Sequence, residues 1–485
     1  MRPLAVSASL ALSLSLLAPA ASAQSGDPVA SKISAQSLRG HLSFLASDLL
    51  EGRGTPSRGQ DLAAEYIAAQ FRRAGLEPAG DDGYFQTSTW QYAERDMNQF
   101  ALQVQAGGKS VSVPASAVDL RMREALGLKA APVVTMPWAD AMADASRADG
   151  KVLVLAMPAD RRAAYGDLQK FKGKPALLVL FDASRKQGSA ANGWLVELEG
   201  PRRPMDALKT ITLYDAAAME ALGNPGATLS LSVPGPVTRP VKLRNVIGVL
   251  RGSDAKLKDT YVMLTSHYDH LGIRNGDIYN GANDDGSGTV SVIEIASSLA
   301  AQKTKPKRSI VFMTFFGEEL GLVGSRYYGK HPVLPIASTV ADLNLEQIGR
   351  TDDSEGPRVS AANLTGFDYT TMPAVLQRAG DKVGVKLVKH PQNSDRYFAQ
   401  SDNQSLADAG VPAHTLSVAY EFPDYHGKDD DWDKIDYENM AKINRMVALG
   451  LLDIANDPKA PTWTAAPNAA KYLDASKQLK ASATK

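Results

Sequence analysis

Five side chains of the types that bind zinc lie at or near the ends of apolar, strand-like runs in the second half of the 485-residue chain, namely His267, Asp284, Glu319, Glu346 and His426. Two zinc ions would bring a charge of about +4, and three carboxylates with two neutral imidazoles would leave about +1, which one bridging hydroxide neutralises. Water held by such an ion has its pKa lowered to about 7, so a strong nucleophile is present near neutral pH. These residue types therefore predict a hydrolytic site built on two metal ions.

Two of the short motifs around these residues also have ordinary explanations. His267 and Asp269 form a His-x-Asp pair in which the carboxylate can orient the imidazole, but two surface-loop residues would give the same string. The neighbouring Asp284 and Asp285 repel each other unless a cation is present, although the first turn of a helix also favours Asp. Glu346 by itself would more often be a surface residue. The position of these residues after strand-like runs favours the metal site.

A pair of acids, Glu318 and Glu319, follows the apolar run at residues 310–316. Acids at such a place are costly unless a cation or water reaches them, so the pair indicates either a metal site or a solvated turn. Because adjacent side chains point in different directions, we assign Glu319 as a ligand and Glu318 as the general base; the reverse is chemically possible. His426 lies in an acidic stretch typical of a solvated loop, and its neighbour Tyr425 could help to stabilise an oxyanion.

The elements that must position these residues follow an α/β pattern. Strand-like runs lie at residues 245–250, 261–265, 309–316 and 339–345, and an apolar helix is predicted at residues 288–300, between the second and third of these runs. This alternation predicts a mixed, largely parallel sheet flanked by helices. Ligands of such sheets bind at the carboxyl ends of the strands, and the predicted metal ligands after the second, third and fourth runs fall at those ends.

The chain is expected to divide into four parts. Residues 111–239 have short apolar runs broken by Gly and Pro and no cluster of His with carboxylates, so they predict an inserted, mostly β domain without catalytic groups. Residues 24–110 and 240–457 form the catalytic domain around it, with a last helix predicted at residues 438–456. The Ala- and Lys-rich residues 458–485 are expected to be poorly ordered.

Composition and the first residues bear on partners and location. Lys plus Arg and Asp plus Glu both number 53, so no net field attracts nucleic acid or an anionic membrane. The chain has no cysteine, which excludes disulfides, thiolate ligands and a cysteine nucleophile. An apolar stretch at residues 4–17 followed by Ala21-Ser22-Ala23 predicts a signal peptide over residues 1–23. We therefore expect a bacterial periplasmic or secreted protein that has no membrane segment after cleavage.

The order His, Asp, Glu-Glu, Glu, His, with the strings Ser-His-Tyr-Asp-His-Leu-Gly and Gly-Glu-Glu, closely resembles the di-zinc aminopeptidase and glutamate carboxypeptidase family. The resemblance covers about residues 245–455 and residues 45–53, and the inserted domain resembles a protease-associated domain. It implies that Asp284 bridges two zinc ions, that Glu319 and His426 complete one site and that His267 and Glu346 complete the other. It also implies a catalytic Glu318, and a peptide between Asp284 and Asp285 that is often cis.

The chain departs from the family at two positions. Glu346 stands where many members have Asp, and a longer carboxylate still binds zinc. Asn403 follows Asp402 where many members have His. This difference leaves open whether position 403 contacts the metal ligands from behind or contacts the substrate. His270, next to the His-x-Asp pair, is interpreted as structural.

The resemblance implies an exopeptidase that hydrolyses peptides, and an aminopeptidase is favoured because a free amino terminus can approach the metal centre and nearby carboxylates. A carboxypeptidase or dipeptidase of the same family is the near rival, and would need a cationic clamp such as Arg350 or Arg396 in the cleft. A receptor-like protein without activity would have lost ligands, and a glutaminyl cyclase would work with one zinc ion. Side-chain preference, oligomeric state and the role of the inserted domain are not predicted.

Overall fold

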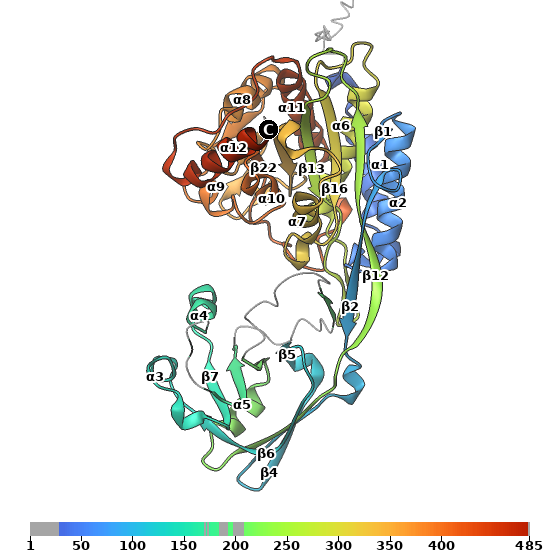
Figure 1. The fold of residues 1–485 in the computed structure, drawn as a ribbon. Helices are drawn as coiled ribbons and strands as arrows, with labels where there is room; N and C mark the ends of the chain where they lie inside the picture. Colours follow the sequence, from blue (N-terminus) through green and yellow to red (C-terminus); the bar gives the residue numbers. More distant parts are fainter. Residues whose placement is uncertain (1–28, 169–170, 172–173, 184–192, 197–207, 484–485) are drawn as a thin grey trace, which may run out of the picture.

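The computed structural model describes residues 29–483 except for residues 169–170, 172–173, 184–192 and 197–207, so the expected signal peptide lies outside the described residues. Figure 1 shows a larger α/β unit and a smaller, mostly β unit, with the long strands β2 (Phe85–Glu94) and β12 (Val237–Leu250) running from the larger unit towards the smaller one. Within the described part of the chain, no helix is both long enough and apolar enough to cross a membrane.

The larger unit is built on a ten-stranded sheet. The central strand β13 (Tyr261–His267) runs parallel to β16 (Ser309–Phe315) and β17 (Thr339–Leu345), and β17 runs parallel to β22 (Ala413–Ser417). The flanks contain antiparallel pairs: β16 with β12, β12 with β2 and with β1 (Glu77–Pro78), and β2 with β9 (Gly193–Val196). On the other edge β22 is antiparallel to β20 (Ala361–Leu364), which is parallel to β21 (Lys386–Val388).

The central strands are buried on both faces, which is why their sequences are continuously apolar. In β13, Val262 and Leu264 belong to one hydrophobic core, while Met263 between them belongs to another on the opposite face. The first core is closed by α1 (Ala35–Leu45), α2 (Arg58–Arg73), α6 (Gly288–Ala300), α8 (Met372–Val383) and α11 (Tyr437–Asn456). The second lies under α7 (Val323–Lys330), α10 (Asn403–Asp408) and α12 (Ala470–Ala483), on the opposite side of the sheet in Figure 1.

The predicted α/β class is confirmed, and the elements that carry the site lie close to their predicted positions. The runs at residues 261–265, 309–316 and 339–345 are β13, β16 and β17, and the helix at residues 288–300 is α6. The sheet is parallel in its centre, where the site residues are placed, and less parallel at its flanks than predicted. Short elements complete this unit: β14 (Gly272–Arg274), β15 (Asp277–Tyr279), β18 (Asp352–Asp353), β19 (Gly356–Pro357) and α9 (Asn393–Arg396).

The smaller unit has an eight-stranded sheet and its own hydrophobic core. Its strand order is β4 (Lys109–Val113), β3 (Ala101–Ala106), β11 (Thr228–Val233), β6 (Leu126–Thr135), β7 (Val152–Ala156), β8 (Leu177–Phe181), β10 (Thr210–Leu213) and β5 (Val118–Arg121). Three short helices accompany the sheet: α3 (Trp138–Ala143), α4 (Arg161–Leu168) and α5 (Ala216–Leu222). The sheet therefore begins ten residues before the predicted boundary at residue 111, while β9, from inside the predicted insert, pairs in the main sheet.

The expectation of a poorly ordered tail after residue 457 is wrong. Residues Ala470–Ala483 form α12, and Trp463 and Tyr472 are buried with their rings stacked at a centroid distance of 5.1 Å. The indole N–H of Trp463 donates to the carbonyl of Gly410 at 2.9 Å. The Ala- and Lys-rich composition conceals an apolar stripe in which Tyr472 and Leu479 lie two helical turns apart, and this stripe packs on the second core.

Candidate metal centre and its cleft

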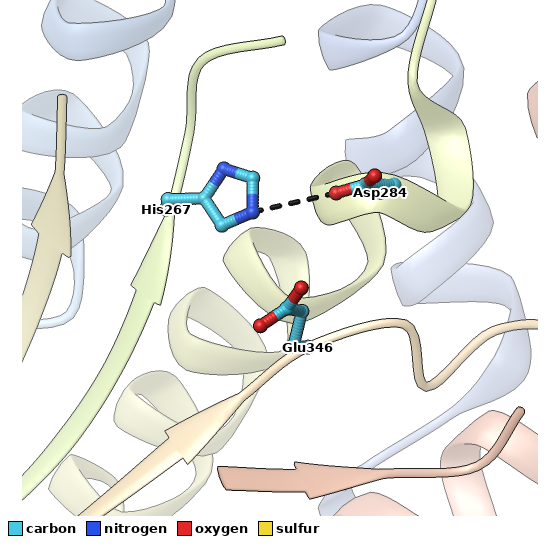
Figure 2. A group of neighbouring side chains, drawn as sticks. All are labelled: His267, Asp284 and Glu346. Atoms are coloured by element: carbon cyan, nitrogen blue, oxygen red, sulfur yellow. Dashed lines mark ion pairs between the residues drawn. The ribbon is translucent and has the colours of Figure 1, made fainter. Parts of the chain in front are cut away.

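The five predicted ligands come together at one edge of the main sheet. His267 is the last residue of β13, Glu319 lies in the turn after β16, and Glu346 directly follows β17. Because these strands are parallel, their carboxyl ends meet at the same edge. Asp284 comes from the turn before α6, and His426 from the loop after β22. Figure 2 shows the side chains of the β13, β17 and pre-α6 residues pointing toward one another.

One group of ligands consists of His267, Asp284 and Glu346. Each offers one ligand atom, and these atoms lie within 4.8 Å of one another. The Nε2 atom of His267 is 3.4 Å from Oδ1 of Asp284, close to the separation of about 3.3 Å expected for two atoms bound to one tetrahedral zinc ion. His267 is fully buried and its Nε2 atom has no hydrogen-bond partner. A buried, unpartnered nitrogen beside two carboxylates fits a zinc ion.

A second group shares Asp284 with the first. The Nε2 atom of His426 lies 3.1 Å from Oδ2 of Asp284 and 3.4 Å from Oε2 of Glu319. The two oxygens of Asp284 thus face two different histidines, as a carboxylate that bridges two ions requires. Burial acts to raise the pKa of Asp284, but contacts with His267 and His426 outweigh it and hold that pKa well below its ordinary value. The residues present fit two zinc ions.

His270, interpreted from the sequence as structural, lies in the same place. Its Nδ1 atom is 2.9 Å from Oε1 of Glu319, and it forms a potential metal-binding group with Asp284 and Glu319. The sequence signal that could have identified it is its position three residues after His267, in the string that carries the resemblance.

Asp269 acts differently from the predicted carboxylate that orients the imidazole. The backbone carbonyl of Asp269, not its carboxylate, is the hydrogen-bond partner of Nδ1 of His267, at 3.1 Å. The carboxylate lies 3.6 Å from that nitrogen and accepts hydrogen bonds from the amide of Glu318 at 3.0 Å and the hydroxyl of Thr55 at 3.1 Å. One residue therefore holds both the imidazole of His267 and the turn that carries the predicted base.

Asp285 supports the backbone behind the ligands. Its carboxylate accepts hydrogen bonds from the amides of His267, Gly288 and Gln347 at 3.3, 3.0 and 3.2 Å. Burial raises the pKa of Asp285 well above its ordinary value, and the nearby charge of Glu346 raises it further. The peptide between Asp284 and Asp285 is cis, as the resemblance implied.

The two adjacent acids Glu318 and Glu319 have opposite electrostatic environments. Burial raises the pKa of Glu318 well above its ordinary value, and the charges of Glu346 and Glu319 add to this effect. Burial also acts to raise the pKa of Glu319, but contacts with His270 and His426 outweigh it and lower that pKa to about 2. The contacts of Glu319 with two histidines favour it as the ligand and Glu318 as the base; burial alone does not separate the roles, because it also raises the pKa of the predicted ligand Glu346, to about 7.

Two charged residues that support the site were not identified from the sequence. Arg53 is 1% exposed and donates hydrogen bonds to the carbonyls of Leu45, Tyr268, Asn280 and Gly281. Its guanidinium therefore ties the loop after β13 to the turn that carries Asp284. On the other side of this turn, the carboxylate of Asp430 accepts hydrogen bonds from the amides of Asn283 and Asp284 at 3.0 and 3.1 Å. In the sequence, Arg53 could be found as the last of residues 45–53, which carry part of the resemblance, and Asp430 as a member of the acidic stretch around His426.

The metal ligands open onto a cleft of about 330 Å³. Tyr425 lines this cleft and stacks on His426 at a ring-centroid distance of 4.1 Å. Burial raises the pKa of Tyr425, and the charge of Asp284 contributes. Three further aromatic residues and one further acid complete its main features: Tyr397, Tyr420, Phe422 and Glu421. Among the described residues, no Lys or Arg lines the cleft.

The possible clamps Arg350 and Arg396, and Asn403 among the two departures, lie outside this lining. Arg350 forms ion pairs with Asp352 at 2.6 Å and Asp424 at 2.8 Å. Arg396 lies over the ring of Tyr397, 5.3 Å from its centroid. Asn403 is buried, with its amide bonded to the carbonyl of Phe398 and the hydroxyl of Thr415. Burial raises the pKa of the neighbouring Asp402 to about 7.

Comparison with known proteins gives one family and one fold. Residues 245–450 match the family model of Peptidase family M28. Aminopeptidase YwaD of Bacillus subtilis is 25% identical over 244 residues, which cover 49% of this chain and 50% of that protein. A probable glutamate carboxypeptidase, VP8 of Zea mays, is 28% identical over 239 residues, 45% of this chain and 32% of that protein. A probable zinc metalloprotease of Leptosphaeria maculans is 36% identical over 265 residues, 46% of this chain and 59% of that protein.

The chain therefore spans between about a third and three fifths of the length of these relatives. Solved structures match over more of the chain. An aminopeptidase from Aneurinibacillus sp. strain AM-1 has a TM-score of 0.61 at 18% identity and covers 91% of this chain and 98% of its own. The zinc aminopeptidase BSAP from Bacillus subtilis has a TM-score of 0.60 at 17% identity and covers 88% of this chain and 97% of its own. At these identities the similarity establishes the fold.

Proposed function

Because residues 245–450 belong to peptidase family M28, we propose that this chain is a zinc-dependent aminopeptidase that releases N-terminal residues from peptides. In this proposal two zinc ions are held by His267, Asp284, Glu319, Glu346 and His426. The observation that carries it is the position of Asp284, whose two oxygens lie 3.4 and 3.1 Å from the imidazoles of His267 and His426.

The protein side chains around the cleft have distinct roles in this reaction. When bound, zinc ions polarise a carbonyl and lower the pKa of water, which are the two requirements of peptide hydrolysis. Glu318 lines the cleft beside the ligands, takes the proton from the attacking water on its carboxylate and delivers it to the nitrogen of the leaving amine. Tyr425, which also lines the cleft and stacks on His426, donates a hydrogen bond to the oxyanion.

The charge of the cleft favours an aminopeptidase over a carboxypeptidase. Curated relatives include both an aminopeptidase and probable glutamate carboxypeptidases, so sequence similarity supports either activity. Apart from the proposed metal ligands, the cleft lining contains the carboxylates of Glu318 and Glu421 and aromatic rings but, within the described part of the chain, no Lys or Arg. A free α-ammonium group is attracted by such a lining, whereas an α-carboxylate needs a positive partner. Of the candidate clamps, Arg350 is paired with Asp352 and Asp424, and Arg396 lies over the ring of Tyr397 but does not itself line the cleft.

The same site speaks against a receptor-like protein and against a glutaminyl cyclase. A receptor-like relative without activity has no need to retain five ligands and a base, yet all six residues converge here. A glutaminyl cyclase needs one zinc ion, whereas the donor atoms on both sides of Asp284 fit two.

The remaining proposals rest on sequence alone: residues 1–23 are removed on export to the periplasm or the medium, and the smaller unit is a protease-associated-like domain.

The proposed activity is tested with four substrates and a chelator. We expect the full chain to hydrolyse an aminoacyl p-nitroanilide, to leave its N-acetylated form intact, and to lose activity in 1,10-phenanthroline and regain it with Zn²⁺. A dipeptide blocked at its carboxyl terminus should be cleaved as well as the free dipeptide. Cleavage only of the substrate with a free carboxyl terminus would reject the aminopeptidase and favour the carboxypeptidase.

The role of Glu318 is tested with Glu318→Gln, which keeps the shape of the side chain and removes its basicity. Loss of a general base typically lowers kcat by about 10²–10⁴, and zinc content should stay normal because Glu319 carries the ligand atoms. The control is Glu220→Gln on the exposed side of α5 in the smaller unit, which should change neither quantity. Full turnover of Glu318→Gln with normal zinc content would exclude Glu318 as the base.

A further inference from the structure

His270 is a buried imidazole that no hydrogen bond accounts for. It is 2% exposed, and neither ring nitrogen has a hydrogen-bond partner among the described residues. The buried histidines outside the site are satisfied: His41 by the hydroxyl of Tyr66, His390 by Glu355, and His414 by a threonine on each side of the ring. Because buried polar groups are nearly always paired, the environment of His270 requires another partner.

The atoms around His270 identify the kind of partner. Its Nδ1 atom lies 2.9 Å from Oε1 of Glu319, yet both atoms lack a hydrogen bond of acceptable geometry. Two atoms bound to one zinc ion at about 2.0–2.2 Å lie about 3.3 Å apart at the tetrahedral angle and about 3 Å apart at the smaller angles of a five-coordinate ion. The separation is therefore that of two ligands on one ion, and the poor alignment speaks against a proton shared between them. Asp284 contributes a third atom within 4.8 Å.

The more exposed ring of His426 approaches the same two carboxylates, those of Asp284 and Glu319. The two imidazoles have a centroid distance of 5.8 Å and an interplanar angle of 69°, and both face Glu319. On this basis we propose that His270 is a ligand of the second metal ion, the ion that Asp284, Glu319 and His426 hold in the proposed function on which this inference rests. The donor set is then two imidazoles and two carboxylates, a combination suited to zinc.

The two histidines of this set differ in how firmly they are held. His426 is 40% exposed. His270 is packed against the backbone of Gly281, where an added Cβ would lie 2.2 Å from Cγ of His270. Its own backbone pairs with Gly54 and donates to the carbonyl of Arg53. His270 thus provides a fixed ligand on the buried side, while His426 provides an accessible one at the cleft.

The inference predicts that His270→Gln in the full chain loses the second ion selectively. Competition with a chromophoric chelator gives the two zinc dissociation constants, and Co²⁺ loaded at the second site reports its ligands through visible absorption. Residues behind a ligand typically contribute 10–100-fold to metal affinity, so loss of a ligand should weaken the second constant at least 100-fold and change the cobalt spectrum. The first constant should stay within threefold of the wild-type value, and the control His41→Gln, at a buried histidine outside the site, should alter neither.

The inference is overturned if a folded His270→Gln chain keeps the wild-type cobalt spectrum and its second zinc dissociation constant is unaltered or weakened tenfold or less. That result would leave the proposed function intact. Failure of the proposed function looks different, because the wild-type chain itself would then bind fewer than two zinc ions. Circular dichroism of the metal-free chains checks the fold. If His270→Gln does not fold, His270→Asn, a smaller replacement that also removes the imidazole, should produce the same selective weakening; a His270→Asn chain with wild-type constants counts against the inference.

Discussion

Replacement of Arg53 should show that the metal centre depends on a buried cation that touches no ligand side chain. Arg53→Met leaves four buried carbonyls, now bonded at 2.6–2.8 Å, without donors. An unpaired buried group costs about 1–3 kcal/mol, so four cost about 8 kcal/mol at the middle of that range. Burial lowers the pKa of Arg53 to about 10, well below that of a free guanidinium, so removing the charge regains about 3 kcal/mol. The expected loss in the free energy of unfolding is therefore about 5 kcal/mol.

Arg53→Lys separates charge from hydrogen bonding. An ammonium group has three donors where guanidinium has five, so at least one of the four carbonyls loses its partner and the loss should be about 1–3 kcal/mol. The assay is urea unfolding with and without chelator, because bound metal adds stability to the folded state. The control is Arg58→Met, at the exposed start of α2, which should stay within about 0.5 kcal/mol of wild type. The reasoning is refuted if Arg53→Met unfolds within 1 kcal/mol of wild type, or if Arg53→Lys is as destabilised as Arg53→Met.

Three further outcomes follow from the site and its surroundings. Asp269→Asn should weaken zinc binding about 10–100-fold in a chelator competition, while Asn at the exposed Asp277 of β15 should not. Tyr425→Phe should lower kcat of the proposed reaction by about 10²–10³ with little change in KM, and an equal rise in KM alone would assign the hydroxyl to substrate binding. Because burial lowers the pKa of His414 from 6.5 to about 4, the unfolded chain takes up this proton first as pH falls. Stability should therefore drop by about 3 kcal/mol between pH 6.5 and 4, and His414→Gln should flatten this slope in urea titrations.

The strands and the ligands that follow them could be predicted because both depend on the burial of the sheet centre on its two faces. The sheet centre is buried on both faces, so β13 and β16 are apolar at nearly every position and stand out as runs. Polar residues directly after such runs must then lie at the edge where parallel strands end. This reasoning placed His267 and Glu346 correctly. It could not place His426, which comes from a loop after β22 that no local pattern aims at the site.

Other features depend on partners far away in the sequence. Arg53 is buried because four carbonyls converge on it, and three of them belong to residues more than 200 positions later. Asp269 orients the imidazole of His267 through its carbonyl, since its carboxylate is engaged by Thr55 and the amide of Glu318. The string His-x-Asp is compatible with either contact. The sequence identifies Asp269 but does not separate its carbonyl, 3.1 Å from Nδ1 of His267, from its carboxylate, which lies 3.6 Å from the same nitrogen.

The assignment of roles to Glu318 and Glu319 shows most clearly what only three dimensions can supply. The two residues are identical and adjacent, so composition, propensity and spacing treat them alike. In the fold, Glu319 faces His270 and His426, whose contacts outweigh burial and lower its pKa to about 2, whereas burial, with the charges of nearby carboxylates added, raises the pKa of Glu318. A ligand must remain charged to hold a cation, and a general base must be able to accept and release a proton. The same neighbours that make Glu319 suitable as a ligand therefore leave Glu318 as the group that can move the proton.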